Sequence, residues 1–303
     1  MEAGCLRLTA TRTRHGLALL LCALAALSST PPARARSLKL ATWNLEWLTL
    51  RPEGDPSLPD DAKPKQLADI ATLAGYARHL DADAVGIEEV DGPAIAARVF
   101  PPDRYRIEMT NDAVVQRVGL AIRNDFAVTR NPDLTGLDAA APGAAHRLRS
   151  GLDVTIARDG HSLRILVVHL KTGCWDHALQ GRGPDACRML KRQLAVLREW
   201  IAARRDEGIG FVLMGDFNRD MPVHDVFLGA LQQVAPLALA TAGSANPCWG
   251  GEAFIDHILA GGPARQWMQP GSLWVLVYRE TDPDMKERLS DHCPVSVRFD
   301  TGR

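Results

Sequence analysis

Polar side chains that can do chemistry recur in this sequence at the points where short apolar runs stop. An apolar run rich in Val, Ile and Leu predicts a buried strand, and the end of a strand is a rigid mount for a functional group. Strands that neighbour each other in a sheet bring such ends together from distant parts of the chain. In order, the polar fragments are Asn44-Leu45-Glu46, Glu88-Glu89, His169, Asp216-Phe217-Asn218, Asp256-His257 and Asp291-His292.

These residue types suit the hydrolysis of a phosphate ester. Carboxylate and amide oxygens are the ligands that Mg²⁺ and Mn²⁺ prefer. A phosphodiester repels nucleophiles, so its cleavage needs a cation, a group that orients and deprotonates water, and support for the leaving oxygen. Histidine can transfer protons or carry a positive charge near neutral pH. The sequence therefore predicts metal-assisted attack of water on phosphorus.

Each fragment taken alone also has a structural interpretation. Asn44 and Asn218 fit turns, and Glu46 or Glu89 fits the solvated end of a strand. His169 fits a hydrogen-bonded core histidine. The occurrence of all six fragments in this order favours the functional interpretation.

The elements that would position these groups alternate along the chain as short strands and fewer helices. So many strands do not fit a simple doubly wound sheet, whereas two sheets packed face to face with helices outside do. We predict helices at Lys65–Leu80, Pro93–Val99, Ala186–Arg205 and Val223–Leu231. We predict strands at Leu38–Trp43, Ala84–Ile87, Tyr105–Glu108, Val118–Ile122, Leu152–Ala157, Leu163–His169, Gly210–Met214, Phe254–Leu259, Leu273–Val277 and Pro294–Phe299.

The order WNLE, IEE, an arginine before a strand, VVH, GDFN, IDH and SDH resembles the endonuclease/exonuclease/phosphatase superfamily, the relatives of deoxyribonuclease I. The resemblance extends from about Leu38 to Phe299, and GDFN followed by SDH is its most specific part. It implies an α/β fold, a four-layer α/β/β/α sandwich with two packed mixed β-sheets. It also implies a divalent-metal-dependent phosphodiesterase.

The same resemblance implies a role for each fragment. Glu89 resembles the central ligand of a Mg²⁺ (or Mn²⁺) ion, with Glu46, Asn44 and Asp291 as the other metal residues. The implied catalytic residues are Asp216, which orients or deprotonates water; Asn218, which helps to hold it; His292, which contacts the phosphate or transfers a proton; Asp256, its carboxylate partner; His169, a second histidine; and Arg149, a phosphate-contacting arginine.

The sequence departs from the superfamily pattern at two places. Glu88 stands where many members have Gln, so it either adds charge near the metal or points to the opposite face. The stretch 111–116 lacks the tyrosine and glutamate of deoxyribonuclease I, which leaves His169 without an obvious carboxylate partner. His257 is expected to be structural, because strand alternation turns it away from Asp256.

The N-terminus is typical of a secretory signal peptide. A basic start precedes the apolar stretch Gly16–Leu27, which is short for a membrane span, and Ala33-Arg34-Ala35 fits a cleavage site. We expect a signal peptide at residues 1–35, a catalytic domain at 36–303 and a periplasmic or secreted protein. The alternative is an apolar helix that stays in the fold. The segment carries four of the 35 basic and one of the 36 acidic residues, which leaves a net charge of −4.

Four cysteines follow this segment, and an even number in an exported protein indicates disulfides. Cys174 with Cys187 is the preferred pair because it would close a Gly-rich loop. Four reduced and buried thiols are the alternative. No cysteine spacing resembles a zinc site.

Nucleic acid, DNA or RNA, is the expected substrate. Trp47 and Trp175 flank strand ends and could stack on bases, and a basic rim could bind phosphates. The acidic net charge permits only a local basic groove. The sequence has no long apolar hairpin of the kind that inserts into a membrane, so we expect no stable membrane association. The alternatives are a phosphoesterase for a lipid head group or small phosphate ester and a catalytically dead binding protein. The rim residues would be Lys171, Arg182, Arg188, Lys191 and Arg192.

Overall fold

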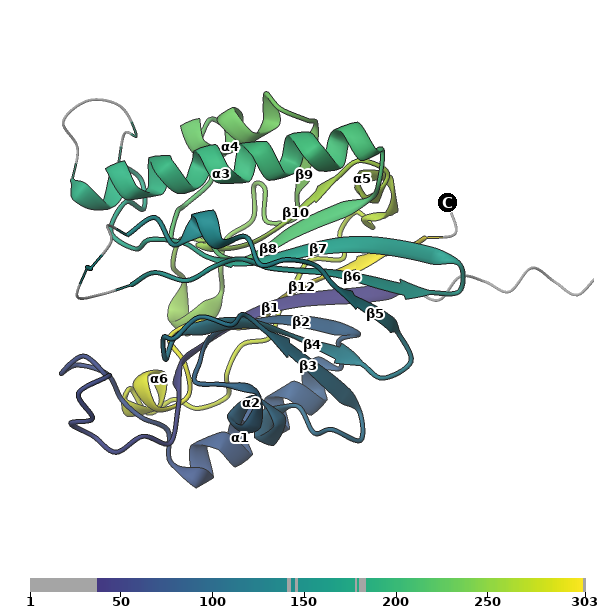
Figure 1. Ribbon diagram of the computed structural model, residues 1–303. Coiled ribbons are helices and arrows are strands. Elements are labelled where there is room, and N and C mark those ends of the chain that lie inside the picture. Colours follow the sequence, from purple (N-terminus) through teal and green to yellow (C-terminus); the bar gives the residue numbers. More distant parts are fainter. Residues whose placement is uncertain (1–36, 141–142, 145–146, 178, 180–183, 302–303) are drawn as a thin grey trace, which may run out of the picture. The chain divides into compact units, whose positions relative to one another are not determined.

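The computed structural model describes residues 37–140, 143–144, 147–177, 179 and 184–301 (Figure 1). These residues belong to one compact unit, Ala35–Arg303. The expected signal peptide at residues 1–35 lies outside the described residues. None of the helices in the described part of the chain is both long and apolar enough to cross a bilayer.

Two six-stranded mixed sheets form the centre of the unit, in the orders β11-β12-β1-β2-β4-β3 and β5-β6-β7-β8-β10-β9. The first sheet comprises β1 (Leu38–Leu48), β2 (Ala84–Val90), β3 (Tyr105–Met109), β4 (Arg117–Arg123), β11 (Trp274–Val275) and β12 (Val295–Phe299). The second comprises β5 (Ala127–Arg130), β6 (Leu152–Arg158), β7 (His161–His169), β8 (Phe211–Asp216), β9 (Leu237–Leu239) and β10 (Asp256–Gly261).

Helices cover the outer face of each sheet (Figure 1). The helices α1 (Leu67–Leu80) and α2 (Pro93–Val99) pack on the first sheet, and α3 (Asp185–Glu207) and α4 (Val226–Gln232) pack on the second. Four short elements complete the described part of the chain: the helices α5 (Ala264–Trp267) and α6 (Asp284–Arg288), and the 3₁₀ turns Thr135–Leu137 and Cys248–Gly250. The predicted four-layer sandwich is confirmed.

Burial of apolar faces explains the layers. One apolar cluster joins the first sheet to α1 and α2, and another joins the second sheet to α3 and α4. A third lies between the sheets, where Leu40 and Val167 belong to opposite sheets and are both fully buried. On α3, Leu190, Leu194 and Leu197 recur at the spacing of one helix face, as the sequence predicts.

The predicted elements are present with shifted ends, and two short strands were not predicted. β1 runs five residues beyond the predicted Trp43, through the first polar fragment. Helix α1 begins at Leu67 and α4 at Val226, later than predicted. The missed strands β5 and β9 have four and three residues and lie at the edges of the second sheet, where pairing on one side suffices and the apolar signal is weak.

Candidate active site

Irregularities in β1 and β2 turn acidic side chains toward the same place. The parallel pairing of these strands shifts register between Asn44 and Leu48, and the pairing of β2 with β4 shifts between Ile87 and Val90. Glu46 and Glu89 have φ angles of 40° and 60°. A bulge re-aims a side chain, and backbone strain in non-glycine residues gathers at functional sites. The sequence pattern locates these residues, whereas the bulges orient them.

The four predicted metal residues lie together at this edge. Asn44 Nδ2 donates to Glu89 Oε1 over 3.2 Å, and the Trp47 amide donates to Glu89 Oε2 over 3.2 Å. The Asp291 amide donates to Glu46 Oε2 over 2.9 Å, which links the loop before β12 to β1. Three carboxylates and one amide oxygen therefore converge from three segments.

The electrostatics of this cluster fit a hard cation. Burial is the main reason why the pKa of Glu46 is raised to about 8; Lys65 opposes the shift, while Asp291 and Glu89 add to it. Lys65 Nζ lies 3.9 Å from Glu46 Oε2, and its side chain is fully buried. One lysine faces three carboxylates here, so a divalent cation would relieve the remaining repulsion between them.

The second sheet aligns three more predicted residues in one row. His169 on β7 pairs with Asp216 on β8, and Asp216 pairs with Asp256 on β10. Gly215 precedes this row with a φ of 141°, and a Cβ there would lie 1.9 Å from the Val168 carbonyl oxygen. Only glycine permits that close approach of β8 to β7.

Asp216 is buried and held by three hydrogen bonds. Its carboxylate accepts from the Asn218 amide at 2.7 Å, from Asn218 Nδ2 at 3.0 Å and from Asn44 Nδ2 at 3.1 Å. Burial raises the pKa of Asp216 to about 7, with His292 opposing and Asp256 adding to the shift. A carboxylate with a pKa near the working pH suits a base that accepts a proton from water.

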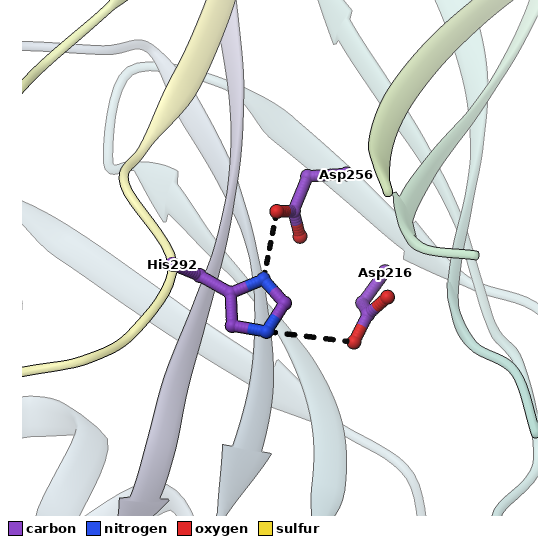
Figure 2. A group of neighbouring side chains, drawn as sticks. All are labelled: Asp216, Asp256 and His292. Atoms are coloured by element: carbon purple, nitrogen blue, oxygen red, sulfur yellow. Dashed lines mark hydrogen bonds and ion pairs between the residues drawn. The ribbon is translucent and has the colours of Figure 1, made fainter. Parts of the chain in front are cut away.

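His292 bridges two carboxylates, as Figure 2 shows. Its Nδ1 lies 2.7 Å from Asp256 Oδ2, and its Nε2 lies 4.0 Å from Asp216 Oδ2. Although burial disfavours the charged ring, Asp256 and then Asp216 raise the pKa of His292 well above its ordinary value. The sequence-based pairing of His292 with Asp256 agrees with this geometry.

These three residues also form a group that could hold a metal, because one ligand atom of each lies within 4.8 Å of the others. A charged His292, however, has no lone pair for a cation and repels it. Its Nδ1 is also engaged by Asp256. The cluster of Glu46, Glu89 and Asp291 is therefore the better cation site of the two.

His169 faces the same carboxylates from β7. Its Nε2 lies 3.5 Å from Asp216 Oδ2 and 3.6 Å from Glu89 Oε1. Burial lowers the pKa of His169 well below its ordinary value, and the charge of Arg149 lowers it further. The ring is thus neutral at neutral pH. The sequence offered no carboxylate partner for it, and the structure places Glu89 and Asp216 in that position.

A cleft of about 1060 Å³ opens above these groups. Arg149 is only 8% exposed, and its Nε has no hydrogen-bond partner among the described residues. A buried guanidinium donor that faces a cleft fits an anionic ligand. Asn44 and Asp256 do not line the cleft themselves, but they bond to Glu89 and His292, which do. The predicted residues that line the cleft are Glu46, Glu89, Arg149, His169, Asp216, Asn218, Asp291 and His292.

The predicted basic rim lines the cleft only in part. Lys171, Trp47 and Trp175 line the cleft; Arg188, Lys191 and Arg192 are not among its lining residues, and Arg182 lies outside the described residues. Arg188, Lys191 and Arg192 lie on α3, whose apolar face packs on the second sheet, so these three cations do not contribute to the cleft. The cationic residues that the sequence did not single out as cleft lining are Arg51, Arg117 and Arg147.

Glu88 and His257 point away from the cleft. Glu88 is fully buried, and its Oε1 accepts a hydrogen bond from Thr42 Oγ1 at 2.9 Å. Burial and the charges of Asp256 and Asp216 raise the pKa of Glu88 well above its ordinary value, which disfavours a negative charge on this side chain. His257 is structural as expected, with ring contacts to Thr241 and to the Arg219 carbonyl.

Residues that the motifs did not reveal hold the loop that carries His292. Tyr278 donates through its hydroxyl to the His292 carbonyl at 3.0 Å, and Trp249 Nε1 donates to the Ser290 carbonyl at 2.9 Å. Ser290 Oγ donates to the Asn44 carbonyl at 2.7 Å, which ties the loop to β1. Only Ser290 had a signal in the sequence, as the first residue of the SDH fragment.

Two disulfides flank the site. The preferred pair Cys174–Cys187 is present, and Cys248 is bonded to Cys293, the residue after His292. The first closes the loop after β7, and the second fastens the loop before β12. The alternative of four reduced thiols is not the one that the structure adopts.

Replacement of Cys248 and Cys293 together by Ser is expected to lower the free energy of unfolding by about 4 kcal/mol, because their separation is 45 residues. Joint replacement of Cys174 and Cys187, which are 13 residues apart, should lower it by about 3 kcal/mol. Urea unfolding of oxidised protein measures both losses. Peptide mapping of non-reduced protein that found these thiols free would contradict both bonds.

Solved structures share this fold at low sequence identity. D. rerio TDP2 complexed with a single-strand DNA product superposes with a TM-score of 0.58 and 16% identity, over 88% of this chain and 99% of that chain. The human Nocturnin catalytic domain with bound sulfate gives 0.56 and 14%, over 87% and 94%. A mannosyl-6-phosphatase of Bacteroides thetaiotaomicron gives 0.54 and 17%, over 86% and 98%.

Sequence comparison identifies the family. No curated protein matches the chain. The model of the Endonuclease/Exonuclease/phosphatase family matches residues 41–292, a range that includes all six polar fragments. The chain therefore belongs to the endonuclease/exonuclease/phosphatase family, whose members are hydrolases that act on phosphate esters.

Proposed function

We propose that this protein is an exported phosphodiesterase that depends on Mg²⁺ or Mn²⁺ and hydrolyses nucleic acid. One observation carries the proposal: Asn44 Nδ2 donates both to Glu89 and to Asp216. This amide joins the carboxylate cluster of the first sheet to Asp216 on the second, the residue that His292 faces. A cation site and a proton-transfer group therefore share one cleft.

Glu46, Glu89, Asp291 and the amide oxygen of Asn44 would hold the cation. When bound, the cation supplies positive charge that neutralises the phosphoryl oxygens. None of these side chains is replaced by an apolar residue, which argues against a catalytically dead protein. The chemistry of the donor set, which consists of oxygen atoms alone, favours Mg²⁺ or Mn²⁺ over a softer metal.

The remaining groups act on water and phosphate. Asp216 accepts a proton from the attacking water, and Asn218 fixes the carboxylate and faces the phosphate. The charged ring of His292, oriented by Asp256, stabilises the negative charge that grows on the phosphoryl and leaving oxygens. Arg149 binds a phosphate oxygen, and His169 approaches the phosphate from β7.

Nucleic acid fits the cleft better than a small phosphate ester does. The cleft is large, and Arg147, Arg149 and Lys171 are among its lining residues, where they can contact phosphates. The complex of TDP2 with a DNA product belongs to a protein of this fold and supports the same choice. Export is proposed from the N-terminal pattern and from the two disulfides, which form in oxidising compartments.

The purified protein should be incubated with plasmid DNA, RNA, sphingomyelin, mannose 6-phosphate and bis-p-nitrophenyl phosphate, each with Mg²⁺, Mn²⁺ or EDTA. We expect hydrolysis of DNA or RNA with either metal and none in EDTA. Full activity in EDTA would overturn the metal requirement. Hydrolysis of sphingomyelin or mannose 6-phosphate without cleavage of nucleic acid would overturn the substrate, and inactivity on every substrate would favour a binding protein.

A further inference from the structure

Trp175 exposes a large aromatic ring at the wall of the cleft. Its residue surface is 50% exposed, and it lines the cleft together with Lys171, His169 and Asn218. Within the described residues, no ring or cation contact involves its indole, whereas Trp43, Trp200 and Trp274 each pack against a ring or a cation. An exposed indole beside such a site leaves its aromatic face available to a flat ligand.

The backbone around Trp175 is held from both sides. Arg219 is 2% exposed, and its Nη1 donates to the Cys174 carbonyl at 2.9 Å and to the His177 carbonyl at 3.0 Å. The amide of Asp220 donates to the Trp175 carbonyl at 2.9 Å. A buried ion pair with Asp225 fixes the guanidinium itself.

The disulfide adds a further constraint, because Cys174 directly precedes Trp175 and is fully buried. An exposed aromatic ring on a backbone fixed at Cys174, Trp175 and His177 is preorganised. Such a ring can bind a flat ligand with little loss of conformational entropy.

The neighbours of Trp175 identify the ligand as a base. The ring shares the cleft with the proposed catalytic groups His169 and Asn218, and the carbonyl of Trp175 bonds to Asp220, two residues after Asn218, so the ligand of the ring would lie near the reacting phosphate. Lys171 and Arg149 supply cations for the adjoining backbone. An indole face binds a nucleobase by stacking regardless of sequence. In a duplex both faces of an internal base are already stacked, so the base must be unpaired or terminal.

We propose that Trp175 is a stacking platform for an unpaired base next to the scissile phosphate, and that the enzyme therefore prefers single strands to duplex. This inference rests on the proposed function and specifies its substrate. It assigns Trp175 to substrate binding and leaves the proton-transfer groups unchanged.

The test compares Trp175→Ala and Trp175→Phe with the wild type on a single-stranded oligonucleotide and its duplex. Trp175→Ala should raise KM about tenfold, within the range expected for loss of one stacked base, with kcat within about twofold. Trp175→Phe should retain most of the affinity, because it keeps an aromatic face. Trp274→Ala is the matched control, since Trp274 lies on β11 outside the cleft, and its KM should equal that of the wild type.

An abasic residue, placed in turn at each position of the oligonucleotide, identifies the contact. At one position it should raise the KM of the wild type as much as Trp175→Ala does, and the two changes together should cost no more than either alone. Equal losses for intact and abasic strands at every position, or a preference for duplex, would overturn the platform. Failure of the wild type to cleave any nucleic acid would instead overturn the proposed function. Thermal midpoints of all variants exclude misfolding as the cause.

Discussion

Glu89→Gln should reduce hydrolysis by on the order of a thousandfold or more, because a metal ion supplies several kcal/mol of charge stabilisation to the transition state. The substitution keeps the size of the side chain and removes its charge from the centre of the proposed cation site. The neighbouring carboxylate on β2, that of Glu88, is fully buried and bonded to Thr42, so it cannot take the place of Glu89. Initial rates on plasmid DNA with saturating Mg²⁺ measure the loss.

Glu199→Gln provides the matched control, since Glu199 is an exposed residue of α3 that does not line the cleft. That variant should retain the wild-type rate. Both variants should show an unchanged thermal midpoint in EDTA, and Mg²⁺ should raise the midpoint of the control only. Full activity of Glu89→Gln would contradict the assignment of Glu89 as a metal ligand.

His292→Ala should lower kcat by on the order of a hundredfold or more, the usual range for a positioned proton-transfer group. The ring lies between Asp256 and Asp216, so its removal deletes the positive charge and leaves two buried carboxylates facing each other. His169→Ala should give a loss of the same order. His161→Ala is the control, because His161 is exposed at the start of β7.

Asp256→Asn should cost less than His292→Ala, since it removes only the partner that orients the ring. The amide of Asn can still meet Nδ1, but it no longer stabilises the imidazolium. Single-turnover rates at saturating substrate separate this effect from binding. A larger loss for Asp256→Asn than for His292→Ala would show that Asp256 acts directly on the substrate.

The motifs located the residues of the candidate site because most of them stand at or beside a strand end, and the apolar runs mark the strand ends. Asp216 could be located from GDFN, and His169 from VVH, before any register was known. Lys65 and Tyr278 could not be found in this way. Lys65 bonds to the Glu287 carbonyl and Tyr278 to Trp43, each across more than 200 residues of sequence, and no local pattern marks such contacts.

The strand ends were harder to predict than the strands. β1 continues to Leu48 because a bulge absorbs Glu46 and Trp47, whereas sequence reasoning ends the strand at the first polar residue. The partner of Cys248 also depended on the fold: the 3₁₀ turn Cys248–Gly250 meets the loop before β12 only after the first sheet has formed. Long-range packing decides both features.

The bond between Cys248 and Cys293 makes the backbone beside His292 depend on an oxidant. Proteins are synthesised in a reducing cytosol, where such a bond does not persist. Until it forms, the loop that bears His292 lacks its covalent anchor. If the protein is exported as we propose, the hydrolase matures only after it has left the compartment that holds the genome and transcripts of the producing cell. Oxidation would then act as a safeguard against self-digestion.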